Sequence, residues 1–322
     1  MSKTFIIQDG SKFIRRGMVP EDATDVVIPN TVSEIWDNAF YGCKKLTNVV
    51  IPSTVSEIGW GAFWGCEKLT DVVIQEGVTS IRGFAFAYCT NLKSITIPAS
   101  VTSLEKGIFS GCAFEKTPKG LTKFDSDMFK DCINLTEVVV PDGTTTIESS
   151  TFENCKKLTD VVIPDGVTSI DDRAFADCTN LKSITIPASV KSIGYGVFSK
   201  CINLSSIIIP NGVEKIDAYT FADCKNLKSI TIPASVKSIG MCSFLNCVNL
   251  GSIIIPNGVE EIGEHAFDGC SSINGVIIIP DSVKHAGIYA FRGCKNLEGI
   301  IIPSNLSKYV FSAFPRSITK IK

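Results

Sequence analysis

The sequence predicts a β-rich α/β solenoid, in which short repeated coils stack on one another, and three columns of recurring residues carry this prediction. Proline returns about every 23 residues from Pro29 onwards, and 12 of the 14 prolines hold this position. Phenylalanine lies 11 residues and cysteine 14 residues after the start of nearly every coil. One residue type at one register position indicates a packing position that every coil shares.

Composition narrows the function classes. The chain has 322 residues, 44% of them hydrophobic, so a packed core is expected. Its net charge of −2 argues against nucleic acid as a partner, because a backbone binder needs a basic surface. No run of 18 apolar residues predicts a transmembrane helix, so membrane insertion is not expected, and the N-terminus lacks the apolar core of a signal peptide. Retention in the cytoplasm or loss of the targeting segments would explain that N-terminus.

Residues 1–28 precede the first full coil. The apolar stretches 5–7 and 12–14 flank Asp9-Gly10, a pair typical of a tight turn between antiparallel strands. We therefore expect a β-hairpin that caps the first coil, because the end coil of an array would otherwise expose its core.

The long strand of each coil is expected to lie just before the proline. In residues 181–186 the side chains of Leu181, Ile184 and Ile186 are expected to point inward. Those of Ser183 and Thr185 are expected to point outward. Pro187 cannot donate a backbone hydrogen bond and ends the strand.

Two further segments complete the coil. Val190 and Ile193 indicate a short extended piece on a second side. Phe175 and Cys178 are three residues apart and predict one helical turn that faces the core.

Twelve of the 13 cysteines belong to the cysteine column, and only Cys242 lies outside it. Buried cysteine packs as a small hydrophobic residue, so we expect a ladder of reduced thiols rather than disulfides. Neighbouring coils would place the Cα atoms within bridging distance, so geometry alone does not exclude disulfides. The spacing matches no zinc-ligand pattern.

Twelve coils are expected over residues 29–302, followed by a partial coil and C-terminal cap at 303–322. The coil 98–117 lacks three residues after Cys112, which predicts an interrupted sheet, with Phe114 replacing the usual leucine. The coil 256–279 has one extra residue, which a β-bulge would absorb.

The consensus P-x-x-V-x-x-I-x-x-x-A-F-x-x-C-x-x-L-x-x-I-x-I resembles the BspA-type leucine-rich repeats over about residues 29–322. The resemblance implies a right-handed solenoid with a parallel sheet on one face and short helical turns or irregular segments on the other. It also implies adhesion and protein binding, as in surface proteins of host-associated bacteria and of protists. It brings no catalytic residues and no cofactor.

The outward strand positions are the first candidate binding surface. An apolar stripe edged by polar groups is typical of a protein-binding face, although strand propensity alone also favours β-branched residues. The candidates are Asp71, Val73, Ser94, Thr96, Glu137, Val139, Asp160, Val162, Ser183, Thr185, Ser206, Ile208, Ser229, Thr231, Ser252 and Ile254. Val50 and Ile277 extend the apolar column by the same 23-residue spacing.

An aromatic cluster in the first two coils is the second candidate. It comprises Trp36, Tyr41, Trp60 and Trp64, and the shared register of Tyr41 and Trp64 predicts that they stack. Exposed aromatic residues often anchor interfaces. Additional apolar cover near the N-terminal cap also explains the cluster, and we favour that explanation, because the ends of a repeat array need such cover.

Cys242 and His265 share one register position on adjacent coils and form the minimal nucleophile and base of a hydrolase. We identify no third group in register and expect no enzyme. Asp125, Asp127 and Asp131 lack the glycine and glutamate of a calcium loop, so no metal site is expected.

The leading interpretation is a non-enzymatic module at the cell surface that binds a host or extracellular matrix protein through its strand face. An intracellular scaffold and a glycan-binding protein are the alternatives.

Overall fold

The computed structural model describes residues 3–304, 306 and 320–321, with the side chains of 320 and 321 left undescribed. The chain is a parallel β-solenoid of about 13 turns with little helix, as predicted. It divides into two compact units. Unit 1 comprises 1–141 and 151–155, and unit 2 comprises 142–150 and 156–322. In the described part of the chain no helix is long and apolar enough to cross a membrane.

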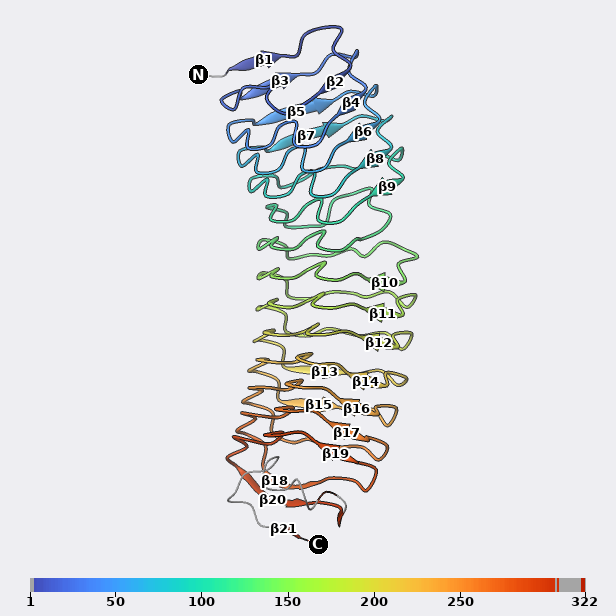
Figure 1. Cartoon of the computed structure of the whole chain (residues 1–322), viewed down its shortest axis with the longest axis vertical. Helices are drawn as coiled ribbons and strands as arrows, with labels where there is room; N and C mark the ends of the chain where they lie inside the picture. The colour runs from blue at the N-terminus through green and yellow to red at the C-terminus, as the bar shows by residue number, and fades with distance from the viewer. Residues whose placement is uncertain (1–2, 305, 307–319, 322) are drawn as a thin grey trace. The chain divides into compact units, whose positions relative to one another are not determined.

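Unit 1 contains two parallel sheets that form two walls of the coils (Figure 1). The first wall, here called the strand wall, has the order β1-β3-β5-β7, with β1 Thr4–Ile6, β3 Asp25–Val27, β5 Asn48–Ile51 and β7 Asp71–Ile74. The second wall has the order β2-β4-β6-β8-β9, with β2 Phe13–Ile14, β4 Glu34–Ile35, β6 Glu57–Ile58, β8 Ser80–Ile81 and β9 Ser103–Leu104. Residues 23 apart pair, as Val50 does with Val73, so each coil repeats the register of the previous one.

Unit 2 repeats the two walls. Its strand wall contains β13 Ser206–Ile208 paired with β15 Ser229–Thr231, and β18 Gly275–Ile278, β20 Leu297–Ile301 and β21 Lys320–Ile321 in one sheet. Its second wall contains β10 Thr146–Ile147, β11 Ser169–Ile170 and β12 Ser192–Ile193, and then β14 Lys215–Ile216, β16 Ser238–Ile239, β17 Glu261–Ile262 and β19 His285–Ala286.

The predicted N-terminal hairpin is wrong. β1 pairs with β3 and β2 pairs with β4, both in parallel, and the two strands lie in different sheets. Thr4–Ile14 therefore forms a coil of the solenoid, because the alternation around Phe5 and Phe13 fits the two walls as well as it fits a hairpin. The capping role of residues 1–28 stays a prediction.

The phenylalanine and cysteine columns form the core. Every phenylalanine of the column from Phe40 to Phe291 is fully buried, and rings of successive coils stack with centroids 4.6 Å apart for Phe40 and Phe63. Phe314 lies outside the described residues. All 13 cysteines are free and buried. The segment predicted as a helical turn consists of consecutive turns, in which Phe175 and Cys178 still face the core.

Both irregular coils alter the sheet. After β7 the strand wall of unit 1 is reduced to isolated bridges between Thr96 and Lys119 and between Lys116 and Glu137, so the interruption predicted for the short coil is present. In the longer coil the register shifts between Gly275 and Val276, where Gly275 has a φ of 70° that favours glycine, as expected of a bulge.

Candidate functional site

The outward columns of the strand wall are open to solvent as predicted. All sixteen candidate residues are exposed, and four of the five apolar members are the most exposed large hydrophobic side chains described, with Ile208 at 73%, Val139 at 76%, Val162 at 79% and Ile254 at 82%. They alternate with buried residues such as Ile253, which is 8% exposed. The alternation follows from the pleat, because every second side chain of a strand points away from the core.

One member of the extended column, Ile277, does not point outward as the 23-residue spacing predicts. Ile277 is buried, whereas Val276 and Ile278 are 55% and 61% exposed. The bulge at Gly275 shifts the register by one residue, which exchanges the inward and outward faces. The outward position of this coil is therefore Ile278.

Polar partners run beside the apolar column. The Ser183 hydroxyl donates to an Asp160 carboxylate oxygen at 3.2 Å, and Lys116 Nζ lies 2.7 Å from Glu137 Oε2. Ser206 and Ser229 face each other across β13 and β15. The strand face is defined as the sixteen residues above, and within each unit it consists of exposed β-branched side chains edged by small and charged groups.

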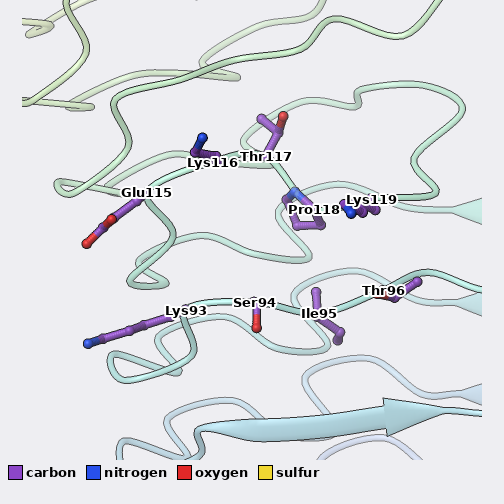
Figure 2. A pocket seen from close by; sticks show the side chains of 9 residues that line it. All are labelled: Lys93, Ser94, Ile95, Thr96, Glu115, Lys116, Thr117, Pro118 and Lys119. Carbon is purple, nitrogen blue, oxygen red and sulfur yellow. The ribbon is translucent and has the colours of Figure 1, made fainter.

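A cavity of about 500 Å³ opens in the strand wall of unit 1 at the interruption. We call it the coil-gap groove, and it lies between residues 93–96 and residues 115–119, which run side by side in Figure 2. Ile95 and Pro118 are buried and contribute its apolar lining. Ser94 and Thr96 of the strand face also line it.

The short coil explains the groove. In the first coils of unit 1 the residue after a column leucine donates its amide to the equivalent carbonyl one coil earlier, as Thr47 does to Thr24 at 2.8 Å and Thr70 does to Thr47 at 2.9 Å. In the short coil Ala113 donates instead to Leu92 at 3.0 Å, one residue before Lys93. Phe114 is drawn into the core, fully buried and edge-on to Phe109, as the sequence predicts for a substitute for leucine. Three missing residues thus leave the two strand segments apart at Lys93.

The aromatic cluster is more dispersed than predicted. Trp36 stacks on Phe13 with centroids 4.1 Å apart, and its indole donates to Glu34 at 2.8 Å. Tyr41 lies under the Arg16 guanidinium, 4.8 Å away.

Trp64 contacts Trp60, Phe84 and Tyr88, with centroids 5.2–5.6 Å apart. The ring contacts found among the described residues do not include the predicted stack of Trp64 on Tyr41. Trp64 is half-buried by its neighbours on the next coil, whereas Trp36, Tyr41 and Trp60 are exposed.

Each coil places two residues in the left-handed region, nine and thirteen residues after its start, and we call these the corner positions. Residues at the first corner include Phe84, Arg173, Tyr219, Cys242, His265 and Tyr289, with φ between 53° and 59°. Cys242 and His265 therefore share a register position because both occupy this corner. The sequence did not predict the corners, since their residue types vary.

The Cys242 and His265 pair has a third group nearby, the Asp268 carboxylate, which the sequence did not predict. His265 Nδ1 and Asp268 Oδ2 are 2.7 Å apart, and Arg292 Nη2 lies 2.6 Å from the same carboxylate oxygen. Cys242 is buried, its thiol is hydrogen-bonded to Tyr219, and burial raises the pKa of that thiol. A thiol that stays protonated and covered is a poor nucleophile, so the arrangement is structural.

The three aspartates act as turn residues. Asp127 and Asp131 occupy the two corners of their coil, and Asp131 accepts a hydrogen bond from Asn154 at 2.7 Å. Asp125 lies 3.3 Å from Lys123 Nζ. Nowhere in the described part of the chain do three or more His, Cys, Asp or Glu residues gather in a way that could hold a metal ion.

Comparison with known proteins identifies the repeat family that the chain matches. The model of the BspA type leucine rich repeat region matches residues 21–119, 114–228 and 214–322. The chain is similar to a leucine-rich repeat protein from Bacteroides ovatus, with 31% identity, coverage of 90% of this chain and 88% of the other, and a TM-score of 0.60.

A leucine rich cell surface protein from Faecalibacterium prausnitzii is also similar, with 28% identity, coverage of 92% and 89%, and a TM-score of 0.57. A leucine-rich repeat protein from Eubacterium ventriosum, at 23% identity, coverage of 78% and 85% and a TM-score of 0.52, shares the fold. No curated protein matches the chain. Leucine-rich repeats are interaction modules that typically lack catalysis. The chain belongs to the BspA-type leucine-rich repeat family.

Proposed function

We propose that this chain is a non-enzymatic adhesion module that binds a protein partner, such as a host or extracellular matrix protein, through the strand face. The observation that carries the proposal is the apolar column, whose members Val139, Val162, Ile208 and Ile254 are 73–82% exposed. Exposed apolar side chains that are rimmed by polar groups mark interaction surfaces in soluble proteins, and unit 2 alone carries three of these four residues. The similarity to a bacterial cell surface protein supports placement outside the cell.

The experiment measures binding of the purified chain to a panel of extracellular matrix proteins by surface plasmon resonance. The test variant combines Val162→Glu, Ile208→Glu and Ile254→Glu. A charge in the centre of an apolar contact costs about 2 kcal/mol or more, so we expect a loss of at least about tenfold in affinity.

The matched control places the same charges on exposed apolar residues of unit 2 away from the strand face, through Ile202→Glu, Met241→Glu and Ile288→Glu. This variant should bind within about twofold of the unchanged chain. If both variants lose affinity equally, or neither does, the strand face is not the binding surface.

An intracellular scaffold would use the same face in another compartment. Surface protease treatment of intact source cells separates the two assignments. Loss of the native full-length protein from treated cells supports adhesion, whereas complete protection would replace adhesion with the scaffold function.

Glycan binding is a second candidate because a cavity of about 480 Å³ lies beside Trp36. Exposed rings provide stacking surfaces, and the charged rim provides hydrogen-bonding groups for hydroxyls. The lining residues are Arg15, Arg16, Glu34, Trp36, Asp37, Glu57 and Arg82. A glycan array that binds the unchanged chain and the Tyr289→Ala control, but not Trp36→Ala, would support it. Equal signals for both variants would rule out this site.

A further inference from the structure

We propose that the coil-gap groove binds an extended acidic peptide that adds a strand at its open end, between residues 93–95 and residues 115–117. This inference rests on the proposed function, since it names the class of protein segment that one part of the strand wall takes. Three observations carry it: unpaired backbone groups on both sides of the groove, an apolar lining, and an excess of positive charge.

The backbone groups come first. In the regular coil that follows Thr47, the strand-wall carbonyl accepts two amides from the next coil, because Thr47 accepts from Thr70 at 2.9 Å and from Asp71 at 3.2 Å. The short coil occupies the same register, because Thr136 and Glu137 both donate to the Glu115 carbonyl. Glu115 and Lys116 therefore hold the amide-donor positions of Thr70 and Asp71. Lys93 holds the carbonyl-acceptor position of Thr47.

The equivalent hydrogen bonds across the groove are not made. Within the residues that the structure describes, the carbonyl of Lys93 and the amides of Glu115 and Lys116 have no backbone partner. The two segments converge at their other end, where the Ile97 amide donates to the Lys119 carbonyl at 3.0 Å. An extended peptide carries donors and acceptors along both edges, so it can pair with both sides of such a gap.

The side chains give the groove its selectivity. Ile95 is 5% exposed and Pro118 is buried, so they form an apolar base on which an extended peptide can lie. The cavity of about 500 Å³ is within the range of ligand pockets. Figure 2 shows Lys93 at the open end of the groove and Lys119 at the converging end.

Charge decides which peptide fits. Lys93 and Lys119 form no ion pair within the described residues, whereas Lys116 is held by Glu137 at 2.7 Å. Glu115 is the one carboxylate among the lining residues, against three ammonium groups. The two free ammonium groups therefore favour a peptide with acidic side chains, in a manner that salt weakens.

The test is a display selection of random eight-residue peptides on the intact chain, followed by fluorescence polarisation with the enriched peptides. We expect enrichment of peptides rich in Asp, Glu and β-branched residues. The combined variant Lys93→Glu and Lys119→Glu should weaken binding at least tenfold. Lys182→Glu and Lys228→Glu, which charge the same register position as Lys93 in regular coils of unit 2, should leave binding within twofold.

A second variant closes the groove and leaves the charges on the rest of the chain unchanged. Residues 113–117 are replaced by the sequence of residues 179–186, Thr-Asn-Leu-Lys-Ser-Ile-Thr-Ile, which restores the regular coil. The urea midpoint of this variant should be no lower than that of the unchanged chain, and this measurement separates loss of peptide binding from unfolding. We expect it to bind no acidic peptide and to keep any matrix-protein affinity that depends on Val162, Ile208 and Ile254.

Three results would overturn the inference: no peptide is enriched, the enriched peptides are not acidic, or the closed-groove variant binds them as well as the unchanged chain does. If a sulfated oligosaccharide binds with the same lysine dependence while peptides do not, the groove is an anion site and the inference is wrong. Strand-face variants in unit 2 report on the proposed function separately, so the two can fail independently.

Discussion

Most cysteines of the column fill space and also donate a hydrogen bond from the thiol to a buried carbonyl. The Cys66 thiol donates to the Phe40 carbonyl at 3.2 Å, and Cys89 donates to Phe63 at 3.3 Å, one coil apart. The same contact joins Cys201 to Phe175 and Cys270 to Phe244, each at 3.1 Å. The Phe40 carbonyl also accepts the Cys43 amide at 3.0 Å, so the thiol supplies a second hydrogen bond to a buried carbonyl, which alanine could not supply.

The phenylalanine column should dominate stability at the level of single residues. Phe175 is fully buried and stacks on Phe198 with centroids 5.8 Å apart. We expect Phe175→Ala to lower the free energy of unfolding by about 3–5 kcal/mol, measured by urea unfolding. Val162→Ala, on the exposed strand face, should change it by less than about 0.5 kcal/mol. A loss below about 1 kcal/mol for Phe175→Ala, with unchanged m, would place Phe175 outside the core.

The buried thiols should make the fold sensitive to alkali. Burial raises the pKa of Cys132 from 9.0 to about 12 and that of Cys43 from 9.0 to about 11. Between pH 9 and 12 the unfolded chain therefore binds fewer protons at these groups than the folded chain does. Their contribution to stability is complete below pH 9 and is lost as pH rises through this window.

Urea midpoints at pH 7.5 and 10 measure this effect. We expect a lower midpoint at pH 10, and Cys132→Ala should reduce the difference between the two midpoints. An unchanged midpoint across this range would contradict the protonated ladder.

At the scale of elements, the two corner positions determine the path of the consecutive turns in each coil. Glycine occupies some of them, such as Gly42 and Gly65, but Lys200 adopts the same left-handed backbone with φ of 58°. A residue with a Cβ pays roughly 1 kcal/mol for this conformation. Lys200→Gly should therefore raise the free energy of unfolding, by up to about 1 kcal/mol.

The matched control is Lys182→Gly, at an exposed position whose backbone is not left-handed. There glycine only adds freedom to the unfolded chain, so stability should fall by about 0.5–1 kcal/mol. Equal effects of the two substitutions would argue against strain at the corner.

The sequence predicted the elements whose residue type repeats. The columns of Phe175, Cys178 and Ile184 each reflect one chemical requirement, burial, and so reveal the coil, its two walls and the outward strand face. The corners were not predicted, because a left-handed backbone accepts Arg173 or Tyr219 as side chains exposed to solvent. The short coil indicated an interruption, but the cavity depends on Ala113 donating to the Leu92 carbonyl rather than to a strand-wall carbonyl, which spacing alone does not determine.

The N-terminal hairpin failed for a related reason. A turn signal at Asp9-Gly10 is compatible with any change of direction, and the tertiary context of the next coil selected parallel pairing with β3 and β4.

At the scale of the whole molecule, stability should be a sum over coils, because each coil contacts its neighbours. Removing residues 187–209, one complete coil of unit 2, joins Ile186 to Pro210 with every column in register. We expect this deletion to fold, with all remaining thiols unreactive towards Ellman's reagent in native buffer. Removing 187–198 instead breaks the register and should make several thiols reactive. Thiol exposure in both deletions would contradict additive coils.

The carbonyl-to-thiol contacts join residues 26 positions apart in most coils, and the strand-wall contacts join residues 23 apart. Other contacts run to the following coil, as when the Phe40 amide donates to the Ala62 carbonyl, so every backbone partner of a coil lies in the coil before it or the coil after it. Within each unit, a nascent chain can lay down one coil as soon as about two dozen further residues leave the ribosome, with no segment waiting for a distant one. Lengthening such a protein by whole coils leaves this order of assembly unchanged.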